Sequence, residues 1–524
     1  MSVLNNTEKK LRNDPSKRWV VQKFGGTSVG KFPLKIANDV AKASMEKNQV
    51  ALVCSARSSD TKADGTTSRL LRAVAATIKS RTQSLGALVK EIEDDHVGAA
   101  NKFISNEEIR EKLIKDIRDD CAALEQYLNA LRIVSETSPR SCDVCIGVGE
   151  RLSCRFMAAV LNDQGIEAEM VSMEEIIDES IDWKALDASF YSYIANQLVS
   201  KVCEIGDKVP VVTGFFGLVP GSIISQIGRG YTDLCAALLA VGLKADELQI
   251  WKEVDGIFTA DPRKVPNARL LALITPEEAA ELTYYGSEVI HPFTMSQVIS
   301  ARIPIRIKNV DNPSGAGTII FPDTISRHGS ATPPHPPKIM PEEARQELMG
   351  KTATAVTIKT DVMVLNIQSN RKAASHGFLA SIFAILDKYK LIVDLITTSE
   401  VHVSMALHEE SENGNFHDAF VELRRLGTLD VMHGMAILSL VGKYMRNMVG
   451  ISGRMFSALA QAQVNIEMIS QGASEINISC VVDEKNAAKA LVCVHEEFLG
   501  KPSSLHVVPS QASLLVEKPW LYSS

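Results

Sequence analysis

The sequence lacks any apolar run of the length that a membrane-spanning helix needs, which is about 20 residues. It also lacks a secretory signal, because the N-terminal segment MSVLNNTEKKLRNDPSKRW contains no apolar stretch. Glu8 and Asp14 make the same segment a poor organelle presequence. We therefore expect no membrane association, a flexible tail over residues 1–17 and a cytoplasmic location.

A basic excess and a cysteine framework are missing as well. The formal net charge is −7, whereas nucleic-acid-binding domains usually carry an excess of Lys and Arg, so we expect no nucleic-acid partner. The nine cysteines are odd in number and scattered, which argues against a set of disulfides. Cys142 and Cys145 form a CxxC pair, but no second pair or His cluster completes four zinc ligands. We expect free thiols in a reducing cytosol.

The sequence does contain an alternation of strand-like and helical segments over residues 18–321. Apolar runs that predict strands are Val20–Val21, Val50–Val53, Ile146–Val148, Val209–Val212, Leu248–Trp251, Pro304–Ile307 and Thr318–Phe321. Helical stretches lie between them, among them Glu108–Val134 and Leu234–Leu243. This alternation predicts an α/β fold in which helices cover a mostly parallel sheet.

The rest of the chain predicts a linker and two small repeated units. Five of residues 321–338 are proline and most others are polar, so we assign residues 322–350 to a linker. Gly377–Phe383 aligns with Gly450–Phe456 at an offset of 450 − 377 = 73 residues. Each copy predicts a strand, a glycine turn, a helix and two further strands. We assign 351–430 and 431–515 to two α+β units that pack on each other, because neither has a large core alone.

A glycine turn directly after the first strand is the first candidate site. Lys23 is followed closely by Gly25, Gly26, Thr27 and Ser28. The glycines let a ligand approach the backbone, the N–H groups and hydroxyls can bind an anion, and Lys23 supplies a charge for phosphate. The turn is not a Walker A loop, which needs GxxxxGK[ST]. A plain strand-to-helix turn is the alternative.

Two further glycine motifs carry charged residues. Arg229 lies in the tripeptide GRG, and Asp233 stands at the start of the helix that follows. Arg229 can clamp a carboxylate through two parallel hydrogen bonds, whereas Asp233 taken alone also suits a helix cap. Glu150 follows GVG, half of a dinucleotide fingerprint, at the expected start of another helix. For Glu150, a cap and a ligand contact are equal alternatives.

Residues 251–263 form a polar loop after the strand Leu248–Trp251. Ligands bind at the carboxyl ends of parallel strands in open α/β sheets. We therefore expect Trp251, Lys252 and Arg263 to face an adenine and its phosphates. The alternative is a solvated loop capped by Asp-Pro.

Taken together, these motifs resemble those of aspartate kinases, and they occur in the same order. Tyr285–Pro292 belongs to the same set, and the wording of Gly228–Asp233 and of residues 284–292 is nearest to fungal enzymes. The repeat resembles a pair of ACT domains, with SNRKAASHGFLASIF and VDLITTSEV as its most specific stretches. The resemblance covers about residues 18–515. It implies an amino acid kinase fold over residues 18–321, followed by two ACT domains.

The resemblance implies transfer of the γ-phosphoryl group of MgATP to the side-chain carboxylate of L-aspartate. Lys23 and Asp233 would be catalytic: Lys23 would bridge the phosphates and the reacting carboxylate, and Asp233 would organise Lys23 and the metal–phosphate region. Arg229 would pair with the α-carboxylate of aspartate and Glu150 with its α-ammonium. Other contacts to aspartate would come from Ser55 and Thr67.

The resemblance also implies a nucleotide site, with Mg²⁺ bound through ATP and no protein ligand assigned to the metal. Its residues would be Gly25, Gly26, Thr27, Ser28, Trp251, Lys252, Glu253, Phe258 and Arg263. Many bacterial relatives have Lys where this chain has Glu288, and Thr or Ser where it has Lys252. We therefore expect Lys252 to have taken over that charge.

For the C-terminal repeat, the resemblance implies a homo-oligomer and feedback inhibition by an amino acid bound at the first ACT domain. The pocket would contain Ser375, Gly377, Phe378, Leu379, Val393, Asp394, Ser399 and Glu400. We expect L-threonine as the effector. Lysine fits less well, because its second ammonium would meet Lys372 and the apolar Ile392.

Two other functions remain open from the sequence. Another amino acid kinase, such as a glutamate kinase, would share the catalytic motifs but would not be expected to carry the repeat. A non-catalytic amino-acid sensor would not be expected to keep Lys23, Glu150, Arg229 and Asp233 intact. ADP release with aspartate and with glutamate distinguishes these possibilities.

Overall fold

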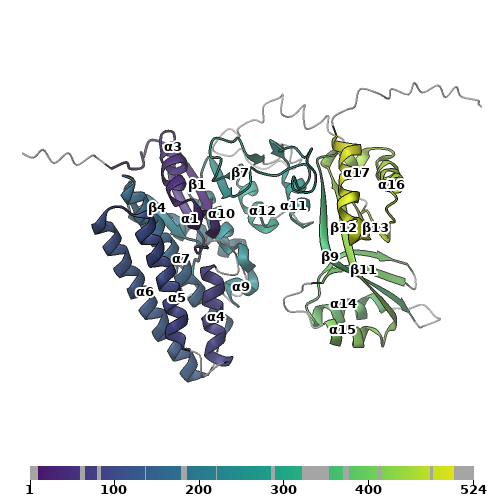
Figure 1. Cartoon of the computed structure of the whole chain (residues 1–524), viewed down its shortest axis with the longest axis horizontal. Coiled ribbons are helices and arrows are strands. Elements are labelled where there is room, and N and C mark those ends of the chain that lie inside the picture. Colours follow the sequence, from purple (N-terminus) through teal and green to yellow (C-terminus); the bar gives the residue numbers. More distant parts are fainter. Residues whose placement is uncertain are drawn as a thin grey trace, which may run out of the picture.

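The computed structural model contains an N-terminal unit and a C-terminal pair of smaller units, which Figure 1 shows side by side. We describe residues 10–58, 65–79, 84–135, 137–178, 186–219, 221–284, 290–321, 353–369, 377–399, 402–409, 416–472 and 476–500. The predicted linker over residues 322–350 lies outside these ranges. No helix in the described part of the chain is long and apolar enough to cross a membrane.

An eight-stranded sheet forms the centre of the N-terminal unit, in the order β3-β4-β2-β1-β5-β7-β8-β6. The strands are β1 (Trp19–Phe24), β2 (Gln49–Cys54), β3 (Ala168–Val171), β4 (Val209–Thr213), β5 (Glu247–Lys252), β6 (Leu273–Ile274), β7 (Ile305–Asn309) and β8 (Thr318–Ile320). Every pairing is parallel except β7 with β8. The predicted mostly parallel α/β fold is confirmed.

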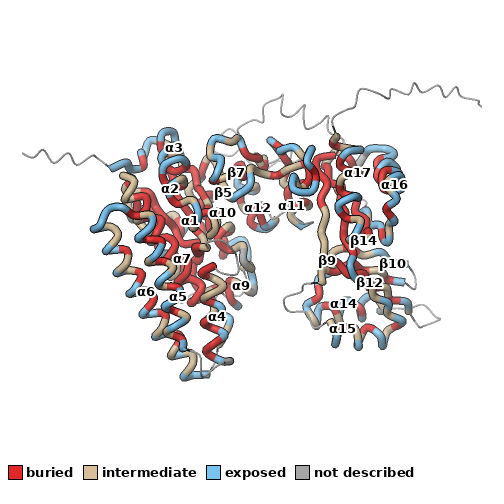
Figure 2. Tube along the Cα trace, in the orientation of Figure 1, coloured by how far each residue is buried: buried red, intermediate tan, exposed pale blue. Residues whose placement is uncertain are grey.

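Helices cover both faces of this sheet. They are α1 (Gly26–Lys31), α2 (Pro33–Lys35), η1 (Ile36–Ala41), α3 (Lys42–Met45), α4 (Thr66–Lys79), α5 (Leu85–Phe103), α6 (Glu107–Val134), α7 (Pro139–Asp163), α8 (Ala188–Glu204), α9 (Ile223–Gln226), η2 (Gly228–Gly230), α10 (Tyr231–Gly242), α11 (Pro276–Tyr284) and α12 (Pro292–Ser300). Along β2, Ala51 and Val53 join the core under α8, α10 and α12, whereas Val50 and Leu52 join the core under α5–α7. This alternation is the period of a strand buried on both faces, and Figure 2 shows both layers buried at the sheet.

One predicted strand is wrong. Ile146–Val148 lies inside α7, and the helix also contains Glu150, which we expected at a helix start. The residues from Cys145 to Glu150 are all buried, because α7 lies between the sheet and the outer helices α4–α6. A helix that is covered on all sides has an uninterrupted apolar run, which periodicity alone cannot tell from a buried strand.

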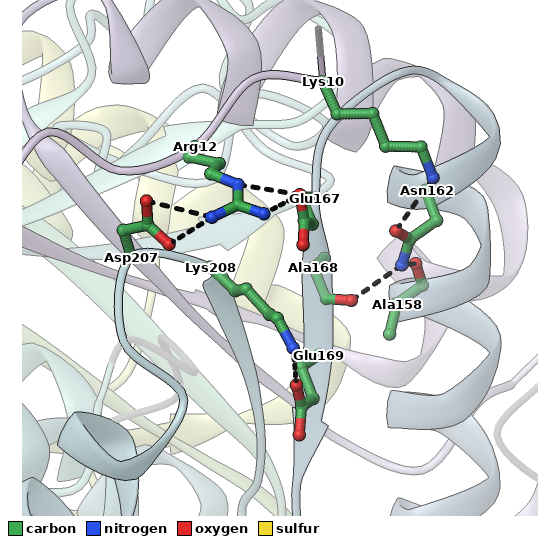
Figure 3. A network of polar contacts seen from close by, with 9 residues as sticks. All are labelled: Lys10, Arg12, Ala158, Asn162, Glu167, Ala168, Glu169, Asp207 and Lys208. Carbon is green, nitrogen blue, oxygen red and sulfur yellow. Dashed lines mark hydrogen bonds and ion pairs between the residues drawn. The ribbon is translucent and has the colours of Figure 1, made fainter. Parts of the chain in front are cut away.

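Residues 10–17 pack against the sheet, which corrects that part of the flexible tail predicted over residues 1–17, and Figure 3 shows Lys10 and Arg12 in place. Leu11 forms a parallel bridge with Ile166 at the start of the β3 edge. Arg12 forms ion pairs with Glu167 and Asp207, with N–O distances of 2.7 and 2.9 Å. The segment therefore covers the outer edge of the sheet, which would otherwise expose unpaired backbone groups. Residues 1–9 lie outside the described ranges.

The C-terminal units share one antiparallel sheet, in the order β10-β11-β9-β12-β14-β13. The strands are β9 (Ala355–Ser369), β10 (Val393–Thr398), β11 (His402–His408), β12 (Gly427–Val441), β13 (Met468–Ser470) and β14 (Asn477–Asp483). The helices are α14 (Phe378–Lys388), α15 (Phe416–Leu423), η3 (Lys443–Asn447), α16 (Ile451–Gln461), η4 (Glu484–Asn486) and α17 (Ala487–Leu499). The repeated helices α14 and α16 both follow glycines with positive φ, Gly377 and Gly450.

The long strands β9 and β12 belong to both C-terminal units. The half of β9 from Met363 onward packs under α14 and α15, in what we call the first C-terminal unit. Ala353 and Val356 instead pack under α16 and α17, in the second C-terminal unit. The expected boundary at residues 430/431 therefore does not separate the two hydrophobic cores. The sequence repeat aligned the helices α14 and α16 correctly. It could not show that one strand is shared by both copies.

Asn13 provides a test of how much the N-terminal segment stabilises the sheet. Its side chain is buried, donates to Val50 O at 3.0 Å and accepts from Val50 N at 2.8 Å. We expect Asn13→Ala to lower the melting temperature and to cost about 1–2 kcal/mol, because Val50 loses both partners in a buried site. Ser16→Ala, which removes an exposed hydroxyl bonded to Asp14, is the control. Equal melting temperatures for the two variants would contradict this role.

Candidate functional site

The carboxyl ends of three neighbouring strands meet at one edge of the parallel sheet. Phe24 at the end of β1 pairs with Cys54 of β2 on one side and with Trp251 of β5 on the other. The glycine turn after β1 therefore lies between the loop that begins at Ser55 and the loop that begins at Glu253. This edge is where open α/β sheets bind ligands.

Gly26 is needed in this turn for close packing rather than for an unusual backbone angle. A Cβ at residue 26 would lie 2.1 Å from Ala56 O, and Ser58 N donates to Gly26 O at 3.0 Å. The turn after β1 is thus held against the loop after β2. The start of α1 follows directly, so its free N–H groups face the same edge of the sheet.

Lys23 and Asp233 form an ion pair at this edge. Lys23 Nζ lies 2.8 Å from Asp233 Oδ1, and both side chains are more than four-fifths buried. Asp233 is in the first turn of α10, yet the cap residue of that helix, Gly230, has no side-chain partner. Within the described residues, Asp233 Oδ1 makes no hydrogen bond besides this ion pair. The geometry favours a role in holding Lys23 over the helix cap that we had kept as an alternative.

Glu150 lies in the middle of α7 and not at a helix start. Its carboxylate is buried and accepts hydrogen bonds from Phe215 N at 2.5 Å and from the Thr232 hydroxyl at 2.7 Å. Burial raises the pKa of Glu150 to about 7, and the hydrogen bonds from Thr232, Tyr231 and Phe215 oppose that rise. Glu150 therefore connects α7 to the loop after β4 and to the start of α10. These partners could not be predicted from the local sequence, because they lie 65 and 82 residues away.

A hydrogen bond between Ser28 and Glu253 connects α1, which follows β1, to the loop that follows β5. The Ser28 hydroxyl donates to Glu253 Oε1 at 2.6 Å. Both were expected at the nucleotide site, and the structure brings them together. Lys252 is half-buried at the end of β5, directly before Glu253.

Trp251 does not offer a surface to an adenine. Its ring is only 2% exposed and stacks on Phe24 with centroids 6.2 Å apart. The Lys308 ammonium lies 4.9 Å from the centre of the Trp251 ring. The ring belongs to the core on the α5–α7 side of the sheet, so it presents almost no surface to a base, and a nucleotide contact of Trp251 stays a prediction for its backbone alone.

Phe258 and Arg263 belong to a hairpin over residues 257–271. Phe258 forms an antiparallel bridge with Leu270, and Leu271 N donates to Ile257 O at 2.8 Å. Arg263 is exposed in the turn of this hairpin and pairs with Asp261 at 2.9 Å. The described contacts of Arg263 are thus with its own hairpin, and its side chain is 88% exposed.

On the other side of the site, the loop after β2 leads to Ser55 and Thr67, both half-buried. Ser55 N donates to Phe24 O at 3.1 Å, and Ser55 O accepts from the Ser153 hydroxyl at 2.7 Å. Arg57 in the same loop was not predicted, although its side chain is buried and forms an ion pair with Asp95 of α5. Burial, together with the charge of Arg69, lowers the pKa of Arg57 to about 10.

Several predicted residues lie outside the described residues. Ser375, Glu400, Lys372 and the segment 285–289, which includes Glu288, are among them. The backbone of Arg229 lies in η2, close before Asp233, but its side chain is not described.

In the first C-terminal unit, Asp394 has a defined geometry. The pairing of β10 with β11 shifts between Val393 and Leu395, so Asp394 is the extra residue of a β-bulge. Its carboxylate binds Lys359 Nζ of β9, with both oxygens at 2.8 Å. Ser399 lies at the turn after β10, where its hydroxyl accepts from His402 N at 3.2 Å.

The acidic residues near the site do not form a metal cage by themselves. No group of three or more His, Cys, Asp or Glu side chains that could hold a metal lies within the described residues. Asp233 is one carboxylate next to a cation, which fits an ion that takes its remaining ligands from water and nucleotide phosphates.

Comparison with protein families and curated proteins assigns both parts of the chain. The model of the amino acid kinase family matches residues 18–309, and an ACT domain model matches residues 438–498. An aspartokinase of Schizosaccharomyces pombe is 72% identical over 524 residues, 100% of either chain. An aspartokinase of Saccharomyces cerevisiae is 53% identical over 493 residues, 92% of this chain and 93% of that protein.

Solved structures extend this similarity to the whole arrangement. Aspartokinase III of E. coli in complex with aspartate and ADP has a TM-score of 0.67 at 25% identity, and the match covers 91% of this chain and 99% of that one. The same enzyme in complex with lysine and aspartate has a TM-score of 0.70 at 25% identity, over 92% and 99% of the two chains. The expected order of an amino acid kinase fold and an ACT region is confirmed.

The raised pKa of Glu150 predicts how stability depends on pH. Because the folded protein holds this proton more tightly than the unfolded chain, the contribution is present below about pH 4.5 and is lost as the pH rises through about 7. Wild type should therefore lose up to about 3 kcal/mol relative to Glu150→Gln over this window. Denaturant unfolding at steps of half a pH unit measures this difference in the free energy of unfolding. Glu46→Gln, at an exposed position, is the control. A constant difference between pH 4 and pH 8 would contradict the assignment.

Proposed function

The chain belongs to the aspartokinase branch of the amino acid kinase family, and we propose that Lys23 and Asp233 mark the point at which its kinase unit transfers phosphate. The reaction is ATP + L-aspartate → ADP + 4-phospho-L-aspartate, which would take place in the cytoplasm. The observation that carries this proposal is the largely buried pair of Lys23 Nζ and Asp233 Oδ1, 2.8 Å apart, beside the glycine turn at the edge of the sheet.

Phosphoryl transfer depends mainly on positioning and on neutralisation of spread negative charge. Lys23 supplies a fixed cation at the end of the central strand β1, and Asp233 restrains that ammonium. The backbone N–H groups of Gly25–Ser28 would bind phosphate oxygens, because they open α1 without a side-chain cap. The Ser28–Glu253 hydrogen bond keeps this turn next to the loop after β5.

Magnesium would enter with ATP and would neutralise charge on the phosphates. Asp233 is the carboxylate nearest to the proposed transfer point and would be its protein contact, directly or through water. Lys252, at the end of β5, would add a further cation for the nucleotide.

Aspartate would bind on the β2 side of the turn. Ser55 and Thr67 line the loop that follows β2, and Arg229 would clamp the α-carboxylate from η2. Glu150 carries a less obvious role, because its carboxylate already accepts from Phe215 N and the Thr232 hydroxyl. An α-ammonium nearby would favour the charged form of Glu150, whose pKa burial raises to about 7.

Replacement of Lys23 tests this assignment. We expect Lys23→Ala to lower kcat by about 10²–10³, because one preorganised charge at the transferring group is removed. Lys47→Ala changes an exposed lysine before β2 and is the matched control. A coupled assay of ADP release measures both, with aspartate and with glutamate as acceptor. Near-normal turnover of Lys23→Ala would contradict the catalytic role of Lys23. Faster turnover with glutamate than with aspartate would favour the glutamate kinase alternative.

We further propose that L-threonine is the feedback inhibitor and binds at the first C-terminal unit. Gly377 opens α14 without a capping side chain, so the N–H groups of Phe378 and Leu379 are available for an α-carboxylate. Asp394, aimed out of its strand by the bulge, would receive the α-ammonium. Val393 precedes it in β10 and Ser399 follows the end of that strand, and Ser375 and Glu400 complete the proposed set.

The surroundings of Asp394 favour threonine over lysine. The Lys359 ammonium is already bound to Asp394, and Ile392 nearby exposes 79% of its surface. A second ammonium would meet a like charge and an apolar side chain, whereas a methyl and a hydroxyl group are tolerated. Lysine is bound by the E. coli aspartokinase III structure.

We also propose a homo-oligomer that assembles through the C-terminal units. Leu379 and Phe383 on α14 each expose 43% of their surface, and Ile392 follows the same helix. Together they form an apolar surface beside the proposed effector pocket, and a second copy of the chain would cover it.

The effector proposal is tested by titrating activity with threonine and lysine separately. We expect Asp394→Ala to raise the threonine concentration for half-inhibition at least about tenfold, because a charged hydrogen bond is lost. Lys359→Met should lower that concentration, because the competing ammonium is gone. Asp387→Ala, an exposed change on α14, is the control. Inhibition by lysine alone, or threonine inhibition that ignores Asp394→Ala, would refute the pocket or its ligand.

A further inference from the structure

The hairpin after β5 is packed into the second C-terminal unit. Ala260 and Val265, on the two sides of its turn, are 4% and 1% exposed. Both belong to the hydrophobic core that α16 and α17 form with Ala353 and Val356. An element that follows the proposed nucleotide site therefore has its apolar anchors in another unit of the chain.

Hydrogen bonds fix the position of this hairpin. Val356 N, at the start of β9, donates to Thr259 O at 2.8 Å. The Thr259 hydroxyl lies 2.9 Å from His495 Nε2 of α17, and both residues are buried. Arg269 on the returning strand donates to Leu499 O at 3.0 Å. The same Thr259 hydroxyl accepts from Arg269 N at 2.9 Å, so one atom joins both strands of the hairpin to α17.

Glu278 makes a second connection between the same two units. One oxygen accepts from Thr275 N at 3.0 Å, and Glu278 N donates back to the Thr275 hydroxyl at 3.3 Å, which is a capping box at the start of α11. The other oxygen accepts from the Thr354 hydroxyl at 2.6 Å and from Lys443 N at 2.9 Å. Glu278 is fully buried, so each of these donors would lose its partner without it.

The helix that Glu278 begins leads back to the proposed transfer point. α11 packs on α12, and α12 packs on α10, which carries Asp233. The second C-terminal unit thus reaches the edge of the parallel sheet by two routes: through the hairpin to the loop after β5, and through α11 and α12 to α10.

We infer that the second C-terminal unit is a positioning part of the nucleotide site, in which His495 holds the hairpin through Thr259 and Glu278 fixes the unit that carries His495. His495 and Glu278 are positioning residues, because neither contacts the Lys23–Asp233 pair. The inference rests on the proposed placement of ATP beside the loop after β5. A contact that only held the two units together would stabilise the fold, and its loss would not change the KM for ATP more than the KM for aspartate.

Steady-state kinetics of matched variants tests this inference in the full-length chain. His495→Leu removes the hydrogen bond between Thr259 and α17 and leaves Arg269 N as the described partner of the Thr259 hydroxyl, whereas His495→Gln keeps a polar nitrogen near the same place. We expect His495→Leu to raise the KM for ATP about fivefold or more, with the KM for aspartate unchanged within twofold. His495→Gln should stay near wild type. Glu278→Gln should act like His495→Leu, and the partly exposed Glu277→Gln should not.

Hydrogen–deuterium exchange on the wild-type protein keeps the inference falsifiable if a variant does not fold. By linkage, ADP with Mg²⁺ should slow amide exchange in residues 253–262 and also in α17. Slower exchange at 253–262 with no change in α17 would overturn this inference alone. No change in either segment would overturn the placement of the nucleotide as well. Equal changes of both KM values in His495→Leu, or none, would also overturn it.

Discussion

The Lys23–Asp233 ion pair depends on the parallel packing of the central strands. β1 lies between β2 and β5, so the end of β1 is enclosed by two loops, and the Lys23 side chain is largely buried there. The first turn of α10, about two hundred residues later in the sequence, places Asp233 next to Lys23. A cation in this position loses part of its hydration, and a nearby carboxylate compensates for that loss. The glycine turn and the Ser28–Glu253 hydrogen bond lie at the same edge of the sheet as this pair.

Two buried carboxylates, Glu150 and Glu278, connect the elements of the kinase unit. They find their hydrogen-bond donors in different parts of the chain. Glu150 takes its donors from the kinase unit alone, namely the loop after β4 and the start of α10. Glu278 divides its two oxygens between its own helix and the second C-terminal unit. Burying a carboxylate is costly unless it is well hydrogen-bonded. Moving either carboxylate would therefore leave buried donors without a partner, which restrains the elements that supply them.

The shared strands of the C-terminal sheet explain how a small sensor region and a kinase unit can act as one body. β9 and β12 run through both cores, so a change at Asp394 in the first unit acts on strands that also carry the second unit. Lys359, the partner of Asp394, is on β9, only three residues after Val356, which packs with the hairpin of the kinase unit. A ligand that displaces Lys359 would thus have a short covalent path to the hairpin after β5. Such a ligand can shift an equilibrium only by its difference in affinity for the two states.

The sequence by itself determined what depends on neighbouring residues. The alternation of apolar runs predicted the parallel sheet, the glycine turns located Lys23 and Asp233, and the offset of 73 residues located α14 and α16. The capping box of Thr275 and Glu278 was not predicted, although its pattern spans only four residues. Tertiary structure decided the rest, because burial and pairing join residues that are far apart in the chain. Only the fold could turn Ile146–Val148 into a covered helix, hide Trp251 in the core, order residues 10–17 on the sheet edge, and bring His495 to Thr259 across 236 residues.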